Sequence, residues 1–307
     1  MYKNWHPDIF ISYLLYLYPF FLILGPAVNN FFHLIILLFS IFILFKKNFF
    51  LTLVQKKIVK ILFFLFFYSV LLTILNENYF FLKNSIFFIK LISFMFVISY
   101  LINEKRFNFN YFLTFNLLIL IVVIFDTFFQ FKFGYNILGY EIEPNNKIRL
   151  TSFFKDEYVV GSFISKIFLP VLIGTYVYLD QKKYKNILFI LFSNLIILAV
   201  LITGERSSLI ITIVSFFFCF ILINKIRKLF IINAILSIFF IGLILTSSPT
   251  LKKRFINETI ENTLKIEVSD TVIKDKNIFN SHYGAIFLAS KEIIKDNILF
   301  GNGLRSY

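Results

Sequence analysis

A glutamate and an arginine stand together in a short polar break between two strongly apolar runs, Ile187–Ile202 and Leu209–Ile223. Both runs predict membrane spans, so the two charges lie at a membrane surface, where charges are costly unless a partner or ligand uses them. The Arg206 guanidinium offers a planar fork of donors that suits phosphate or carboxylate. We therefore expect a lipid-linked phosphate as its partner. The alternatives are an ion pair with Glu205 and a contact with lipid headgroups.

Four further polar residues are candidates for the same site. Asp126 and Gln130 come at the end of the apolar run Tyr111–Phe129, while Arg149 and Arg254 lie in polar stretches. A carboxylate such as Asp126 pairs with a cation or accepts hydrogen bonds from backbone amides more often than it catalyses. Arg149 is a second cation on the predicted outer face. Arg254 follows Lys252 and Lys253, and contacts with anionic headgroups or solvent would satisfy this basic run.

His282 is the candidate general base, because the other two histidines, His6 and His33, lie away from the polar stretches that hold the arginines. The competing interpretation is a surface residue at a helix start, with Ser281 in the cap region. No nucleophile elbow, phosphate-binding glycine loop or dinucleotide fingerprint is present, and Cys219 is the single cysteine. The sequence therefore predicts neither a metal site nor a cofactor.

The composition is that of an all-α polytopic membrane protein. The 307 residues are 59% hydrophobic with a mean hydropathy of +0.82, a balance that soluble globular domains do not reach. The net charge of +14 suggests nucleic acid in a soluble protein, but here lysines that hold loops on the cytoplasmic side account for it. The 46 phenylalanines are compatible with an AT-rich genome and indicate no aromatic binding surface.

Apolar runs of about 16–22 residues, near the length that crosses a bilayer, predict about nine transmembrane helices. The predicted spans are Ile9–Gly25, Phe31–Phe45, Ile58–Leu75, Ile86–Ile102, Tyr111–Phe129, Val159–Leu179, Ile187–Ile202, Leu209–Ile223 and Leu229–Ser247. Residues 1–247 are thus expected to form a helical bundle. Residues 248–307 are expected to begin a large loop, which contains an amphipathic helix over His282–Leu299.

The distribution of Lys and Arg predicts a cytoplasmic N-terminus. The loops then assigned to the cytoplasm carry twelve such residues: Lys46, Lys47, Lys56, Lys57, Lys105, Arg106, Lys182, Lys183, Lys185, Lys225, Arg227 and Lys228. The three short loops on the other face carry two, Lys83 and Arg206. Three segments are therefore expected on the outer face, namely Phe131–Tyr158, the break around Arg206 and the chain from Ser248 onward. We expect the functional site where they meet.

Taken in order, these outer segments resemble the O-antigen ligase and O-antigen polymerase family. The likeness rests on Asp126…Gln130…Gly134…Gly139 with Arg149-Leu-Thr-Ser-Phe, on Thr203-Gly-Glu-Arg-Ser-Ser-Leu209, on Leu251-Lys-Lys-Arg254-Phe, and on Lys295-Asp-Asn-Ile-Leu-Phe-Gly301-Asn-Gly303. It covers roughly residue 126 to the end. Each piece is short, and the specificity comes from their order on one predicted membrane face.

The resemblance implies a metal-independent glycosyltransferase of the bacterial inner membrane. Such enzymes take a glycan from undecaprenyl diphosphate on the periplasmic face and pass it to lipid A core, as ligases, or to another lipid-linked repeat, as polymerases. The family's arginines hold the diphosphate and a histidine serves as base. By this resemblance Arg206 is the expected diphosphate ligand, helped by Arg149 and Arg254 and supported by Asp126, Gln130 and Glu205.

One departure from the family pattern concerns the base. In the family the histidine motif follows the Gly-X-Gly segment, whereas His282 precedes it, and we therefore expect the chain to be truncated before that motif. Two alternatives stay open: a transporter or flippase of a lipid-linked or anionic solute, and a non-catalytic fragment. A transporter would need charges inside several spans, whereas charges such as Lys90 and Asp126 lie near span ends.

Overall fold

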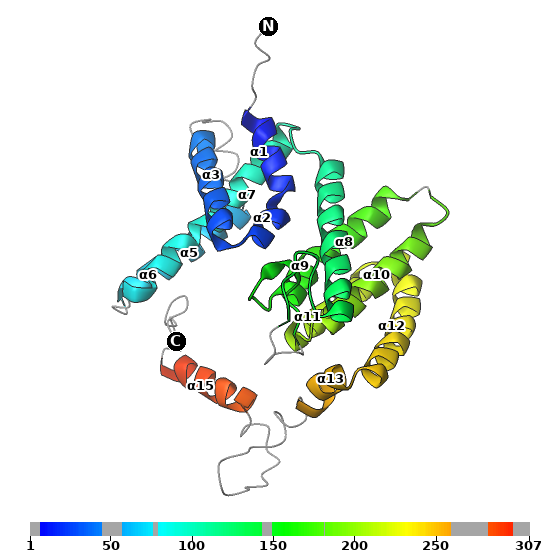
Figure 1. The fold of residues 1–307 in the computed structure, drawn as a ribbon. Helices are drawn as coiled ribbons and strands as arrows, with labels where there is room; N and C mark the ends of the chain where they lie inside the picture. Colours follow the sequence, from blue (N-terminus) through cyan, green and yellow to red (C-terminus); the bar gives the residue numbers. More distant parts are fainter. Residues whose placement is uncertain are drawn as a thin grey trace, which may run out of the picture. The chain divides into compact units, whose positions relative to one another are not determined.

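The computed structural model describes residues 7–44, 57–75, 79–142, 149–180, 182–258 and 282–296. Helices make up most of these ranges (Figure 1). The chain divides into two compact units, of which the first comprises residues 1–14, 26–108 and 261–307. The second unit comprises residues 15–25 and 109–260 and contains all the predicted anion ligands.

Seven described helices are long and apolar enough to cross a membrane. They are Pro26–Leu44 (α3), Lys57–Leu75 (α5), Leu82–Asn103, Phe109–Phe133 (α8), Val160–Tyr178 (α9), Lys185–Ile202 (α10) and Asn224–Ser247. The third of these joins the end of α6 (Tyr79–Phe87) to α7 (Ile89–Asn103), and the last joins a 3₁₀ turn to α12 (Arg227–Ser247). The protein is thus an all-α polytopic membrane protein, as the hydropathy predicted.

Two of the nine predicted spans differ from simple crossing helices. The first is divided into α1 (Pro7–Tyr16) and α2 (Tyr18–Leu24), bent by 60°. Pro19 stands at the start of α2, and its ring and missing N–H explain the break. The eighth, α11 (Arg206–Leu222), has 17 residues, about 26 Å of helix, slightly less than the hydrocarbon core of about 30 Å.

Within the first unit, α3 packs on α7, and α5 packs on both α6 and α7. Val59, Ile92 and Phe96 form a small buried cluster there. Lys90 donates a hydrogen bond to Asn30 of α3 and lies over the Phe87 ring, so this charge near a span end has protein partners. The predicted amphipathic helix forms over His282–Asp296 (α15), and the apolar residues Ile286, Phe287 and Ile294 are exposed on it.

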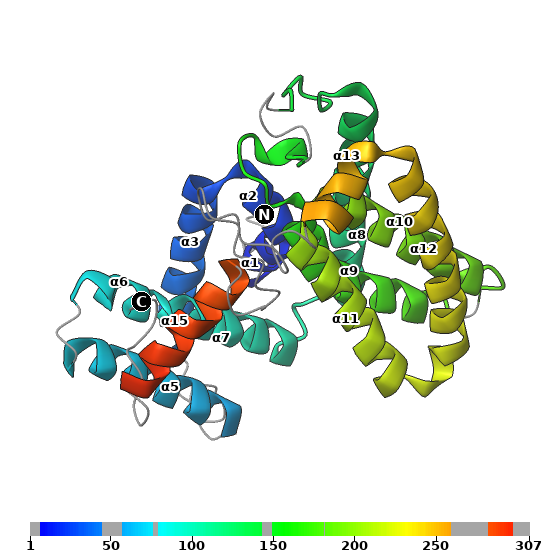
Figure 2. The ribbon, with the colours of Figure 1, turned by 90° about the horizontal axis from the view of Figure 1, so that it is seen from below.

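The second unit is a bundle of α8 to α12 around one large apolar core. α10 and α12 lie side by side in both views (Figures 1 and 2). A buried polar seam joins these two helices: Asn233 accepts hydrogen bonds from Ser193 and Asn194, and Asn194 accepts one from Ser237. Polar pairs of this kind hold transmembrane helices together, because lipid offers them no other partner. The seam thereby fastens α12 to α10, the helix that ends just before the turn with Glu205 and Arg206.

Candidate anion-binding site

The described parts of the three polar segments in the second unit, which include residues 149–158, 203–209 and 248–258, come together at one end of it. Leu150 of the first segment donates its backbone N–H to the Thr203 carbonyl of the turn over residues 203–209, at 3.3 Å. Leu150, Ile202 and Leu251 also form a buried apolar cluster. Leu251 belongs to α13 (Pro249–Lys252). The turn and the two neighbouring segments are therefore anchored to one another by burial of apolar surface.

Glu205 ties two helix N-termini to each other. Its carboxylate accepts the backbone N–H groups of Gly161 and Ser162 in the first turn of α9, at 2.7 and 3.0 Å. It also accepts the Ser208 hydroxyl in the first turn of α11, at 2.7 Å. Helix N-termini leave unpaired donors and favour negative charge. Glu205 is 7% exposed and is therefore a structural carboxylate that orients the residue next to it, Arg206.

This arrangement replaces one sequence-based interpretation, the ion pair between Arg206 and Glu205. Arg206 does not pair with Glu205, its neighbour in the chain; among the described residues its ion pair is with Glu258. Asp156 and Glu157 closely precede α9 in the chain, where carboxylates would suit the helix dipole. They are exposed in the turn before it, and the α9 amides bind the carboxylate that arrives from residue 205 instead.

Gly161 permits this close approach, and its replacement by alanine is expected to separate the turn from α9. A Cβ atom there would lie 2.7 Å from the Thr203 hydroxyl oxygen and 3.1 Å from the Glu205 carboxyl carbon. Overpacking of this kind typically costs about 1–3 kcal/mol. We therefore expect Gly161→Ala to lower the thermal unfolding midpoint of the purified protein in detergent.

Gly242→Ala is the matched control, because Gly242 is also helical and a Cβ atom added to it would meet nothing within 4 Å. Alanine is favoured over glycine in a helix by about 1 kcal/mol, so this variant should melt at or slightly above the wild-type midpoint. Equal midpoints for the two variants would contradict the tight contact between Gly161 and the turn.

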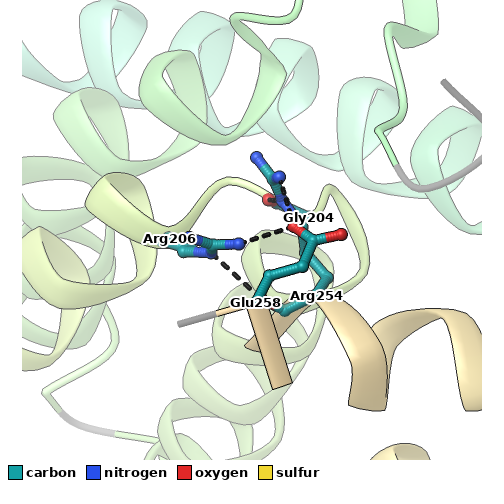
Figure 3. A network of polar contacts seen from close by, with 4 residues as sticks. All are labelled: Gly204, Arg206, Arg254 and Glu258. Carbon is teal, nitrogen blue, oxygen red and sulfur yellow. Dashed lines mark hydrogen bonds and ion pairs between the residues drawn. The ribbon is translucent and has the colours of Figure 1, made fainter. Parts of the chain in front are cut away.

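Through its Nε atom, each of Arg206 and Arg254 binds a backbone carbonyl of the segment that carries the other. The Nε of Arg206 donates to the Arg254 carbonyl at 3.0 Å, and the Nε of Arg254 donates to the Gly204 carbonyl at 3.3 Å. Gly204 has a φ of +72°, a left-handed conformation that suits glycine. Figure 3 shows the two side chains converging from the turn and from the segment after α13. The reciprocal contacts fix the direction of both guanidinium groups.

The terminal nitrogens of this arginine pair, Arg206 and Arg254, meet on one carboxylate. Glu258 Oε2 lies 2.7 Å from Arg206 Nη2 and 2.8 Å from Arg254 Nη1 (Figure 3). The side chains of the pair are 13% and 25% exposed and that of Glu258 is 23% exposed. The two arginine side chains are therefore mostly buried but still reach solvent. Their terminal N–H groups point at the same carboxylate oxygen.

Asp126 and Gln130 have a different role: they hold the loop that follows α8. Asp126 accepts the Ile137 N–H at 2.8 Å and the Ser152 hydroxyl. Gln130 Oε1 accepts the N–H groups of Thr151 and Ser152, at 3.1 and 2.7 Å. Both side chains are completely buried. Of the options considered for Asp126, the structure therefore shows acceptance from the backbone, and both residues position residues 149–152.

Arg149 does not join the arginine pair, although the next residue, Leu150, donates a backbone hydrogen bond to Thr203 of the turn. Its guanidinium lies 4.8 Å from the Tyr158 ring centroid and donates to the Tyr158 carbonyl at 3.5 Å. Its Nε is buried and has no hydrogen-bond partner among the described residues. Of the three arginines predicted as diphosphate ligands, two therefore converge on one carboxylate and the third stacks on a tyrosine.

His282 is the first residue of α15 in the other unit, and its side chain lies outside the described part of the structure. Two residues of the second unit were missed by sequence reasoning. Glu258 had no recognisable motif around it. Lys166 had a clear signal, a charge inside a predicted span; it is exposed on α9, with its Cα about 7.5 Å further along the helix than that of Gly161.

Comparisons with known proteins add no family assignment. No family model matches the sequence, and neither a curated protein nor a solved structure matches the chain. The class that the fold defines is therefore that of a multi-pass, all-α membrane protein with a preorganised arginine pair at one end of a helical bundle.

Proposed function

We propose that the second unit holds the donor site of a glycosyltransferase that acts on glycans linked to undecaprenyl diphosphate. The arginine pair is the observation that carries this proposal. Two guanidinium groups from separate elements are fixed by backbone carbonyls and direct terminal donors to one anionic oxygen. Arginine forks suit phosphate oxygens, and partial desolvation strengthens such contacts.

The charge of the pair favours a diphosphate. The two arginines carry two positive charges and, on four terminal nitrogens, eight N–H donors, whereas Glu258 brings one negative charge to both of them. A lipid-linked diphosphate brings more than one negative charge and several acceptor oxygens. Its lipid chain would remain in the bilayer, because the pair lies beside the start of α11 and the end of α10, at the expected membrane surface.

In the proposed reaction an acceptor hydroxyl attacks the anomeric carbon of the donor glycan. The bond from that carbon to the diphosphate oxygen breaks, and the leaving undecaprenyl diphosphate keeps the electron pair. Arg206 and Arg254 stabilise the negative charge that develops on this oxygen, as preorganised donors do in other transfer reactions. The acceptor proton passes to a general base. The acceptor is lipid A core or another lipid-linked repeat.

The distribution of basic residues supports a periplasmic position for this site in a bacterial inner membrane. The turn around Arg206 follows α10, while Lys182 and Lys183 lie in the loop at the other end of α10 and Lys185 is its first residue. Such lysines mark cytoplasmic loops. The arginine pair would then face the compartment in which the resemblance to O-antigen ligases and polymerases implies that glycan transfer occurs.

A second candidate function, transport of a lipid-linked or anionic solute, is favoured by one observation, the exposed Lys166 within α9. Charged residues inside spans often mark transport paths. A snorkelling lysine near the end of a span explains the same observation, because the side chain can reach the membrane surface where the arginine pair lies. Transport is therefore the alternative, and one experiment separates the two.

We expect the purified full chain in proteoliposomes, supplied with a donor glycan on undecaprenyl diphosphate and a lipid-linked acceptor repeat, to lengthen the acceptor glycan. The products are followed by gel electrophoresis and by release of undecaprenyl diphosphate. A protein that moves the donor across the bilayer, with no change in glycan length, would contradict the proposal and support transport.

A further inference from the structure

Glu258 occupies the place at which an anionic ligand of the arginine pair would bind. A single oxygen of its carboxylate takes both short contacts, 2.7 Å from Arg206 and 2.8 Å from Arg254. The donors used are terminal nitrogens, whereas each Nε is committed to a backbone carbonyl. A phosphate that binds these two terminal nitrogens therefore competes with Glu258 for them.

We propose that Glu258 closes the site when it is empty and that an isoprenoid diphosphate opens it by displacing this carboxylate from the arginine pair. The identity of the ligand rests on the proposed function. The competition between Glu258 and an anion rests on the contacts of Glu258 with Arg206 and Arg254. Glu258 brings one negative charge to two guanidinium groups. A diphosphate brings enough negative charge for both, so the exchange favours it over a monoanion.

The local structure allows Glu258 to leave without disturbing the two arginines. Glu258 directly follows a π-helical turn, Lys253–Asn257 (η4), a geometry that is rare and frequent at functional sites. The backbone contacts of both Nε atoms do not involve Glu258. The segment before it is anchored by Leu251, which is 2% exposed. Rotation of the Glu258 side chain is therefore sufficient to release the terminal nitrogens from its carboxylate.

The competition predicts that removal of the Glu258 charge strengthens ligand binding. The probe is farnesyl diphosphate, titrated calorimetrically into the full chain in nanodiscs. We expect Glu258→Gln to bind it about tenfold more tightly than wild type, which corresponds to about 1.4 kcal/mol, because the ligand no longer displaces two ion pairs. Glu157→Gln removes an equal charge from an exposed position and should change the dissociation constant by less than about twofold.

Equal dissociation constants for wild type and Glu258→Gln would overturn this inference. If wild type binds and Arg206→Ala does not, while Glu258→Gln equals wild type, the anion site stands and Glu258 is only a structural ion pair. Absence of binding in all variants would overturn the proposed function as well. If Glu258→Gln shows no cooperative melting, Glu258→Asp takes its place, because the shorter side chain reaches the arginine pair less well. This variant should still bind farnesyl diphosphate more tightly than wild type. A dissociation constant equal to that of wild type would overturn the inference.

Discussion

Replacement of Arg206 by alanine is expected to abolish long-chain glycan in cells that depend on this protein for it. The variant loses the charge-assisted hydrogen bonds to the diphosphate, each worth about 1.5–3 kcal/mol, and the Nε contact that holds the Arg254 backbone. Together these losses correspond to a decrease in transfer of at least about 100-fold. Glycan length on gels is the measurement. Arg206→Lys keeps the charge without the fork and should retain a small part of the activity.

Arg227→Ala is the matched control for this substitution. Arg227 also binds backbone carbonyls through its Nε and Nη2, those of Phe220 and Ile221, but it lies at the start of α12, at the other end of α11 from Arg206. Its loss should leave glycan length unchanged. Long-chain glycan in cells with Arg206→Ala, at a wild-type amount of protein, would show that Arg206 does not hold the donor.

Glu205→Ala is expected to produce the largest loss of stability of any single substitution considered. It removes a buried acceptor of three hydrogen bonds and leaves the N–H groups of Gly161 and Ser162 without their partner. Unsatisfied buried donors cost about 1–3 kcal/mol each, so we expect a loss of about 3 kcal/mol. The thermal unfolding midpoint in detergent measures it, and binding at Arg206 should weaken in parallel because α11 loses its N-terminal contact.

Two further variants define this effect. Glu157→Ala removes an exposed carboxylate close to α9 in the chain and should leave the midpoint nearly unchanged. Glu205→Gln keeps one acceptor oxygen but places an amide NH₂ group near other donors. Its thermal unfolding midpoint should therefore lie between those of wild type and Glu205→Ala. A wild-type midpoint for Glu205→Ala would contradict the role of this carboxylate in joining α9 to α11.

The helices of the bundle were predictable because a bilayer imposes one simple requirement, about 20 apolar residues in succession. Hydropathy therefore located helices at all nine predicted spans. It did not reveal that Pro19 divides the first one, because a proline can also kink a span without dividing it. The charge of Lys166 was visible in the sequence but did not disturb the apolar run around it.

The candidate site was predictable in its segments and less so in its contacts. Arg206 and Arg254 were both expected as anion ligands, and they meet; Arg149 was expected with them and stacks on Tyr158 instead. Glu205 stands beside Arg206 in the chain, yet its side chain turns to α9. Which neighbour a charged side chain selects depends on helix packing, and local sequence carries little information about that packing.

The most direct test of the central claim is the affinity of the wild-type chain and of the Arg206→Ala/Arg254→Ala variant for farnesyl diphosphate in nanodiscs. Farnesol serves as the uncharged comparison. We predict saturable binding of the diphosphate to the wild type, no binding of farnesol, and a loss of at least about 100-fold in the double variant. Equal affinity of wild type and double variant for the diphosphate would contradict an anion site at the arginine pair.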